Sequence, residues 1–144
     1  MVDFLMESGA KVDIFTASTF CMPDVVRAEL QRDPELVKQR RVGATPLNWA
    51  VRPRRNHDAA PEICKALIDA GADVHDGDEY ESNMTPLHHA AEWGPKICLQ
   101  LVDLLIESGA DINAKDQQRW TALQYAKDRG RKEMIAHLTK LGAT

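Results

Sequence analysis

This chain of 144 residues lacks the short motifs that assign a chemistry to a protein. It has no phosphate-binding glycine loop, no His-Glu-x-x-His pair and no Gly-x-Ser-x-Gly turn, which would supply a phosphate cradle, zinc ligands or an activated serine. His88 and His89 are adjacent, so in a helix their side chains diverge by about 100° and cannot hold one metal ion from one face. We therefore expect no enzyme, no cofactor and no metal site.

Cysteine and long apolar runs are also scarce. The three cysteines, Cys21, Cys64 and Cys98, are an odd number at spacings that suit neither a disulfide framework nor a zinc site. No uncharged apolar stretch is long enough to span a bilayer, and no signal-peptide pattern opens the chain. These absences predict a reducing, cytoplasmic location and no membrane partner.

Neither charge of one sign nor runs of β-branched residues dominate the chain. The net charge is −4 and the isoelectric point is near 5.7, which argues against a nucleic-acid partner. Hydrophobic residues make up 44% of the chain and charged residues 28%, which is ordinary for a soluble fold. Because alanine, leucine and glutamate are plentiful, we expect a single, mainly helical domain.

What the chain does contain is a repeat. Thr-Pro-Leu occurs at 45–47 and 85–87, and Thr-Ala-Leu follows at 121–123. Between these starts, Gly-Ala-Asp followed by an apolar residue occurs at 71–74 and 109–112. A period of 33 to 40 residues indicates stacked units rather than one interwoven core. Stacked units build broad recognition surfaces and rarely perform chemistry.

The recurring residues resemble the ankyrin repeat, whose core is Thr-Pro-Leu-His-x-Ala. Residues 85–90 match that core in full, whereas Asn48 and Gln124 replace the histidine with side chains that still form hydrogen bonds. The resemblance covers nearly the whole chain. It implies an all-α solenoid of stacked helix-turn-helix repeats with projecting β-turn or hairpin finger loops, acting as a protein-binding module.

The same register predicts the repeat boundaries. Residues 2–10 match residues 102–110 at seven of nine positions, so residues 1–13 are either an N-terminal cap or half of a truncated repeat. The remaining units are a divergent repeat at 14–44, a repeat with an inter-helix insertion at 45–84, a repeat at 85–120 and a C-terminal capping repeat at 121–144. Expected helices include 13–19, 23–32, 61–70 and 95–108.

Candidate partner-binding residues lie on the exposed face of the first helix of each repeat, which lines a concave groove in ankyrin-like stacks. We expect Trp49, His89 and Tyr125 to form a column of rings along it, because each follows the histidine position of its repeat. One turn on, the same face carries Arg52, Glu92 and Asp128, with Trp93 and Arg129 beside them, while Trp120 lies at the base of a finger. Exposed aromatic residues beside charges are typical of interface hot spots.

The finger loops supply a second set of candidates. Arg40 and Arg41 make the first finger basic, and Asp76, Asp78, Glu79 and Tyr80 belong to an acidic second finger. Either these fingers neutralise each other, or the acidic one steers a basic partner. Arg52 is expected at the opposite end of the helices from the fingers, in the inter-helix loop.

The sequence thus predicts a module that binds another protein through the concave helix face and the finger loops. Two narrower alternatives are open. The chain could mask a partner's active site as an inhibitor, antitoxin or immunity protein, or it could bridge two proteins as an adaptor. A third alternative is self-association through the N-terminal helix, so we expect a monomer or a weak homo-oligomer.

Overall fold

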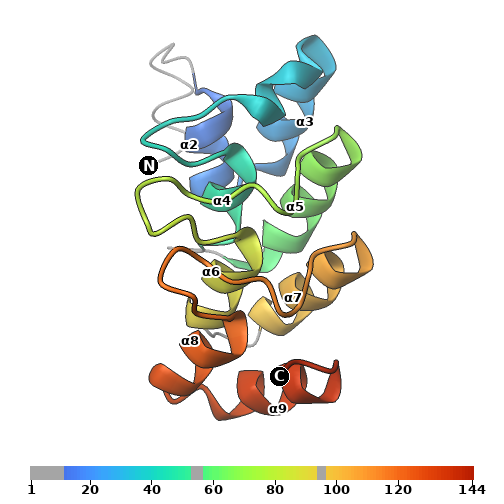
Figure 1. Ribbon diagram of the computed structural model, residues 1–144. Helices are drawn as coiled ribbons and strands as arrows, with labels where there is room; N and C mark the ends of the chain where they lie inside the picture. Colours follow the sequence, from blue (N-terminus) through green and yellow to red (C-terminus); the bar gives the residue numbers. More distant parts are fainter. Residues whose placement is uncertain (1–11, 53–56, 94–96) are drawn as a thin grey trace.

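Helices in pairs, stacked one on the next, make up the computed structural model, which describes residues 12–52, 57–93 and 97–144. The pairs are α2 (Ile14–Thr19) with α3 (Pro23–Arg32), α4 (Pro46–Ala50) with α5 (Ala60–Asp69), α6 (Pro86–Trp93) with α7 (Ile97–Glu107), and α8 (Ala122–Asp128) with α9 (Lys132–Lys140). Short 3₁₀ turns, η1 (Pro34–Lys38) and η2 (His57–Ala59), complete the set. The first helices form one layer and the second helices the other (Figure 1). The all-α solenoid is thereby confirmed.

The helices begin where capping residues satisfy their free backbone N–H groups. The Thr45 hydroxyl accepts a hydrogen bond from the backbone N–H of Asn48, and Pro46 follows at the first helical position, where a missing N–H costs nothing. Thr121 and Gln124 form a reciprocal capping box at the start of α8. Asp13 caps α2, so that helix begins at Ile14, one residue later than expected.

In two of the repeats, the side chain at the histidine position holds the finger loop that ends the same repeat. His88 Nδ1 accepts hydrogen bonds from the backbone and hydroxyl of Thr85, so Nε2 carries the proton and donates to the Trp120 carbonyl at 2.9 Å. The Asn48 amide similarly donates to the Asp76 carbonyl at 3.0 Å. Gln124 turns back to the backbone N–H of Thr121. The expectation that these replacements remain hydrogen-bonding groups is confirmed.

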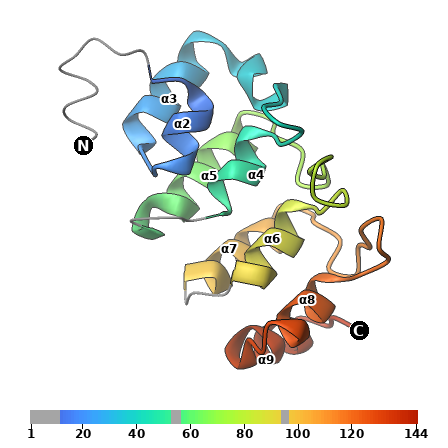
Figure 2. The same cartoon turned by 90° about the vertical axis from the view of Figure 1, so that its left-hand side faces the viewer.

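Three finger loops, residues 38–44, 73–84 and 111–120, project from the same side of the stack (Figure 2). Isolated β-bridges between Arg41 and Ala44 and between Asp78 and Met84 close the first two. Neighbouring fingers are joined, since Glu79 N–H donates to the Gly43 carbonyl and Gln117 N–H donates to the Ser82 carbonyl. The fingers therefore form one continuous edge.

The core runs between the two helix layers. Its fully buried side chains come from both helices of each pair, and small alanines are among them; they include Leu47, Ala50, Ile63, Leu67, Leu87, Ala90, Leu101, Leu105, Met134 and Leu138. Helices contact those of their own and the adjoining units. Stability in such an arrangement is approximately a sum of local units and their interfaces.

Some expectations differ from the structure in detail. The second helix of the repeat at 45–84 runs from Ala60 to Asp69, one residue earlier than expected, and α3 has the expected bounds. The proposed half repeat at 1–13, with the apolar residues considered for self-association, lies almost wholly outside the described residues. Among the residues that the structure does describe, no helix is long and apolar enough to cross a membrane.

Candidate functional site

The expected column of exposed rings is wrong for two of its three members. His89 is fully buried and Tyr125 is buried, whereas Trp49 is half-buried. The register correctly puts these residues at equivalent helix positions, but other side chains cover two of them. Arg52 lies over His89, and the third finger covers Tyr125.

Tyr125 anchors the third finger instead of facing a partner. Its hydroxyl donates to Asp116 Oδ2 at 2.6 Å, and its ring centroid lies 5.1 Å from that of Trp120. Asp116 Oδ1 also accepts the backbone N–H of Trp120. Burial, together with the nearby Asp116 carboxylate, raises the pKa of Tyr125. Trp120 is half-buried at the finger base, as part of the same anchor.

Arg52 lies in the turn after α4, as expected, but its side chain does not stay at that end of the helices. Because α4 ends at Ala50, position 52 leaves the helix and its buried side chain turns back toward the second finger. There the guanidinium pairs with the buried Asp78 carboxylate and lies 3.4 Å from Glu81 Oε1. Arg52 Nη2 also donates to His89 Nε2 at 2.7 Å. Arg52 therefore connects α4, the second finger and α6.

The basic first finger is largely neutralised within the protein. Arg40 pairs with Asp76 and donates to the Gly77 carbonyl, which ties the first finger to the second. Arg41 pairs with Asp13, and its guanidinium lies 4.7 Å from the centre of the Phe15 ring. Of the two alternatives for these charges, neutralisation between the fingers accounts for Arg40 and Asp76, whereas Arg41 and Asp78 pair with residues outside the fingers, Asp13 and Arg52.

Glu92, Asp128 and Arg129 also interact with one another. Arg129 on the last turn after α8 pairs with Glu92 at the end of α6, and it lies 4.0 Å from Asp128. Arg131 Nε donates to the Glu92 carbonyl at 3.3 Å. Trp93, which follows Glu92, remains exposed. These contacts join the ends of α6 and α8 that lie away from the finger loops.

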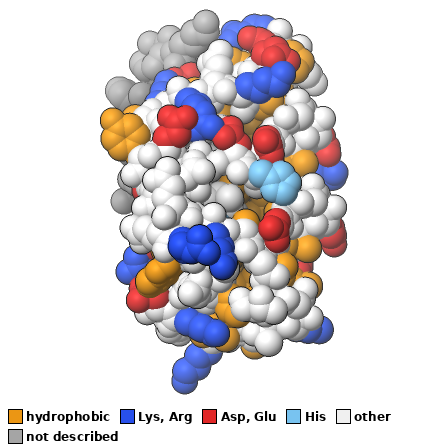
Figure 3. All heavy atoms as spheres, viewed as in Figure 1, with side chains coloured by type: hydrophobic (Ala, Val, Ile, Leu, Met, Phe, Trp, Pro, Cys, Tyr) orange, Lys and Arg blue, Asp and Glu red, His pale blue; other side chains and the backbone are white. Residues whose placement is uncertain are grey.

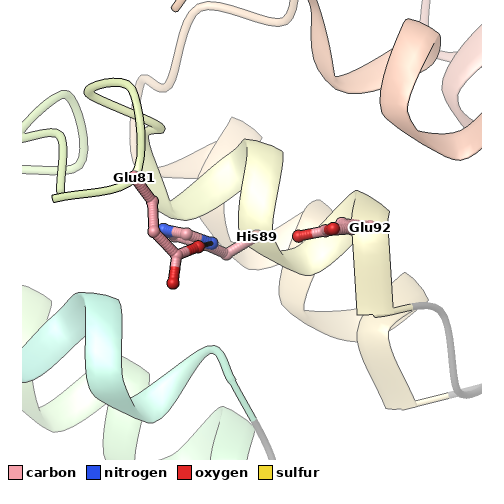
Figure 4. Close-up of side chains that lie close together, drawn as sticks. All are labelled: Glu81, His89 and Glu92. Carbon is pink, nitrogen blue, oxygen red and sulfur yellow. Dashed lines mark ion pairs between the residues drawn. The ribbon is translucent and has the colours of Figure 1, made fainter.

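One trio has the composition of a metal site and was not found from sequence. Ligand atoms of Glu81, His89 and Glu92 lie within 4.8 Å of one another, and Figure 4 shows both glutamates reaching toward the histidine ring. His89 Nδ1 is buried and has no hydrogen-bond partner among the described residues. The spacing of three residues along α6 places His89 and Glu92 on one helix face.

The surroundings of this trio do not fit a metal ion. Arg52 donates to His89 Nε2, so the single proton of the neutral ring lies on Nδ1, which then has no lone pair to offer. A metal-bound histidine normally donates its second N–H to an acceptor, and here a guanidinium occupies that position. Burial and the Arg52 charge hold the pKa of His89 well below its usual value. The trio therefore belongs to a polar network around the buried His89 and Arg52, with Glu81 at its exposed edge.

An open apolar pocket lies on the face formed by α2 and α4. It has a volume of about 140 Å³ and is lined by Phe15, Thr16, Thr19, Phe20, Arg41 and Trp49. We call it the aromatic pocket. Phe20 is 43% exposed at its rim, and Trp49 is held by a hydrogen bond from its indole N–H to the Arg41 carbonyl.

Phe15 and Phe20 were missed because the first repeat lacks the Thr-Pro-Leu signature. A usable signal exists once the start of α2 is known. Phe20 is the seventh residue after Asp13, and Arg52 is the seventh after Thr45, so the two positions are equivalent.

The finger edge carries a second exposed apolar feature, which we call the fingertip pair. Val42 is 61% exposed and Tyr80 77% exposed, and they belong to adjacent fingers. Hydrophobic side chains stand beside acidic and basic ones where the fingers project in Figure 3. The pair adjoins the aromatic pocket through Arg41, the residue before Val42.

Comparison with known proteins places this architecture in a family. The model for ankyrin repeats, in three copies, matches residues 1–116 and also residues 47–144. Ankyrin repeat and SOCS box protein 5 of Bos taurus is 42% identical over 72 residues, which are 50% of this chain and 18% of that protein.

Two further relatives show how widely the repeat is used. Palmitoyltransferase ZDHHC17 of Homo sapiens is 36% identical over 94 residues, 65% of this chain and 14% of that protein. Putative E3 ubiquitin-protein ligase XBAT34 of Arabidopsis thaliana is 32% identical over 95 residues, 66% of this chain and 23% of that protein. The chain therefore spans less than a quarter of the length of each of these three relatives.

Proposed function

The chain belongs to the ankyrin repeat family, and we propose that it binds another protein through the aromatic pocket and the adjoining fingertip pair. Ankyrin repeats are generally protein–protein interaction modules. The observation that carries the proposed surface is the open pocket of about 140 Å³ whose walls include Phe15, Phe20 and Trp49. An apolar cavity of roughly 150 Å³ holds one benzene ring, so this pocket suits one large apolar side chain of a partner.

The composition of the surface supports the proposal. Interface hot spots are enriched in tryptophan, tyrosine and arginine, and they combine an apolar centre with a polar rim. Here Phe20 and Trp49 form the apolar part, Arg41 stands at the rim, and Tyr80 extends the surface along the fingers. His89 and Tyr125 are left out of the surface because they are buried.

We propose no chemical step for this domain. His88 is engaged at both ring nitrogens, and the buried Cys64 thiol has a raised pKa, which makes it a poor nucleophile. A masking role as an inhibitor, antitoxin or immunity protein is a narrower form of the same proposal. It requires that the partner's own activity falls when the complex forms.

The test is a binding measurement with variants of matched chemistry. A partner captured from the source lysate by the wild-type chain is purified, and its affinity is measured by titration calorimetry. Phe20→Ala is expected to weaken binding by about 2 kcal/mol, roughly 30-fold in Kd, as a hot-spot residue does. The control is Leu141→Ala, another exposed apolar residue, which lies just after α9. Equal affinities for the wild type and Phe20→Ala would refute the proposed surface.

A further inference from the structure

We infer that the tip of the second finger, Glu79-Tyr80-Glu81, holds a basic side chain of the partner, an arginine or a lysine. The inference rests on the proposed function, which it deepens by naming the chemistry of the partner segment. Three features of the tip support it: a fixed aromatic ring, two weakly engaged carboxylates and an uncompensated negative charge.

Tyr80 is exposed but its position is fixed by the neighbouring finger. Gly43 has a positive φ of 74°, and a Cβ atom added there would lie 2.9 Å from Tyr80 Cδ2. The ring therefore rests against bare backbone, and a side chain at position 43 would push it away. The backbone N–H of Tyr80 donates to Asp78 Oδ1 at 2.9 Å, and Glu79 N–H donates to the Gly43 carbonyl. A ring fixed before binding loses little entropy on association.

The two flanking carboxylates are held much less firmly than the acids below them. Asp76 and Asp78 form close ion pairs with Arg40 and Arg52. By contrast, Glu79 Oε1 lies 3.6 Å from Arg40 and Glu81 Oε1 lies 3.4 Å from Arg52. The side chains of Glu79 and Glu81 are 63% and 49% exposed. Both carboxylates are therefore accessible to a cation from outside.

The charge balance of the second finger favours a cation. The finger contains five carboxylates, and two guanidinium groups, those of Arg40 and Arg52, reach it from neighbouring elements; the five are Asp73, Asp76, Asp78, Glu79 and Glu81. Three negative charges are left uncompensated by these pairs. Complementary charge of this kind mainly raises the association rate and the specificity of a complex.

A basic side chain can use every part of this tip. Its methylene stem packs against the exposed Tyr80 ring and Val42, while its charged head stays in the polar layer above. A cation near the ring gains from cation–π attraction, and the Glu79 and Glu81 carboxylates accept its N–H groups in charge-assisted hydrogen bonds. An acidic or purely apolar partner segment would leave these carboxylates unpaired.

The probe for this inference is a library of random 12-residue peptides displayed on phage and selected on the wild-type chain. We expect the enriched peptides to contain arginine or lysine more often than the unselected library. The strongest binder is then synthesised, and its Kd is measured by fluorescence polarisation. Tyr80→Ala is expected to weaken it at least fivefold, and Glu79→Gln combined with Glu81→Gln at least tenfold.

Two comparisons keep the inference falsifiable. Replacing the peptide arginine with citrulline should weaken binding to the wild type but change little for the double glutamine variant. Glu107→Gln combined with Glu133→Gln removes the same charge from helices α7 and α9 and should leave the Kd unchanged. Unfolding midpoints by circular dichroism confirm that each variant folds.

The outcomes separate this inference from the proposed function. Peptides that lose affinity with Phe20→Ala but not with Tyr80→Ala or the glutamine pair would uphold the protein-binding surface and overturn the basic-residue inference. Enriched peptides without basic residues would overturn it as well. Peptides whose affinity none of these variants alters would overturn both.

Discussion

Removing the Arg52 guanidinium should destabilise the protein more than removing any surface cation. The side chains of Arg52 and Asp78 are both buried and form an ion pair, and Arg52 also donates to the buried His89. Arg52→Met preserves much of the side-chain volume but leaves the Asp78 carboxylate buried without its cation. Breaking a buried pair in this way typically costs about 3–5 kcal/mol. That is a large share of a total stability that is usually about 5–15 kcal/mol.

The assay is urea unfolding at pH 7 followed by circular dichroism, with thermal unfolding beside it. A loss of 3–5 kcal/mol corresponds to a fall of roughly 10–20 °C in Tm for a domain of this size. The matched control is Lys65→Met, which removes a cation from the exposed pair with Asp69. Surface pairs at this helical spacing contribute only about 0.3–0.5 kcal/mol.

A double variant gives the sharper test of the reasoning. Asp78→Asn removes the buried charge while its side-chain oxygen can still accept the Tyr80 N–H. Arg52→Met combined with Asp78→Asn should therefore be more stable than Arg52→Met alone, by about 0.5–3 kcal/mol of coupling. Should Arg52→Met prove as mild as Lys65→Met, the idea that this buried pair fastens the second finger is refuted.

Three further outcomes follow from the buried polar groups. Because burial lowers the pKa values of His88 and His89, the unfolded chain binds more protons below about pH 6.5, so stability should fall as the pH drops from 7.5 to 5.5, and less steeply in His89→Leu. Thermal unfolding against pH checks this, and a flat profile would contradict it. Tyr125→Phe deletes the bond to Asp116 and should cost about 1–3 kcal/mol in urea unfolding, whereas Thr139→Val, an exposed hydroxyl on α9, should cost far less. Cys64, whose pKa is raised by burial, should react with a thiol reagent only at the rate of global unfolding, and rapid labelling in the native state would show that its surroundings open locally.

Much of the fold could be predicted because the repeat signature is made of residues with local structural tasks. Thr45 and Thr121 cap helices through bonds to residues three positions along, and Pro46 fits the first turn wherever that helix lies. Such short-range requirements are visible in a single sequence. His88 and Asn48 bind backbone carbonyls of the finger loop that ends their own repeat, so the repeat register predicts these bonds as well.

The candidate site was harder to predict, because exposure depends on what covers a helix face. The register places His89 and Tyr125 at the same helix position as Trp49, but it does not say that Arg52 lies over His89 or that Asp116 and Trp120 enclose Tyr125. Arg52 lies 37 residues from His89, and it starts an insertion that other repeats lack. The repeat pattern does not predict this contact, because the equivalent position of the other units holds Phe20, Glu92 or Asp128 instead of arginine.

One position of the repeat frame carries a different side chain in each unit. We count from the residue that precedes the first helix of each pair. The seventh residue after it is Phe20 in the first unit, Arg52 in the second, Glu92 in the third and Asp128 in the fourth. Phe20 forms the rim of a pocket, Arg52 holds a buried carboxylate, and Glu92 binds the Arg129 side chain of the next unit. In the second and third units this position is therefore occupied by contacts within the protein, whereas in the first it presents an apolar ring. Because the backbone frame repeats while this side chain changes, Phe20 is the apolar member of the set, and under the proposed function substitutions at Phe20 should alter binding without altering the frame.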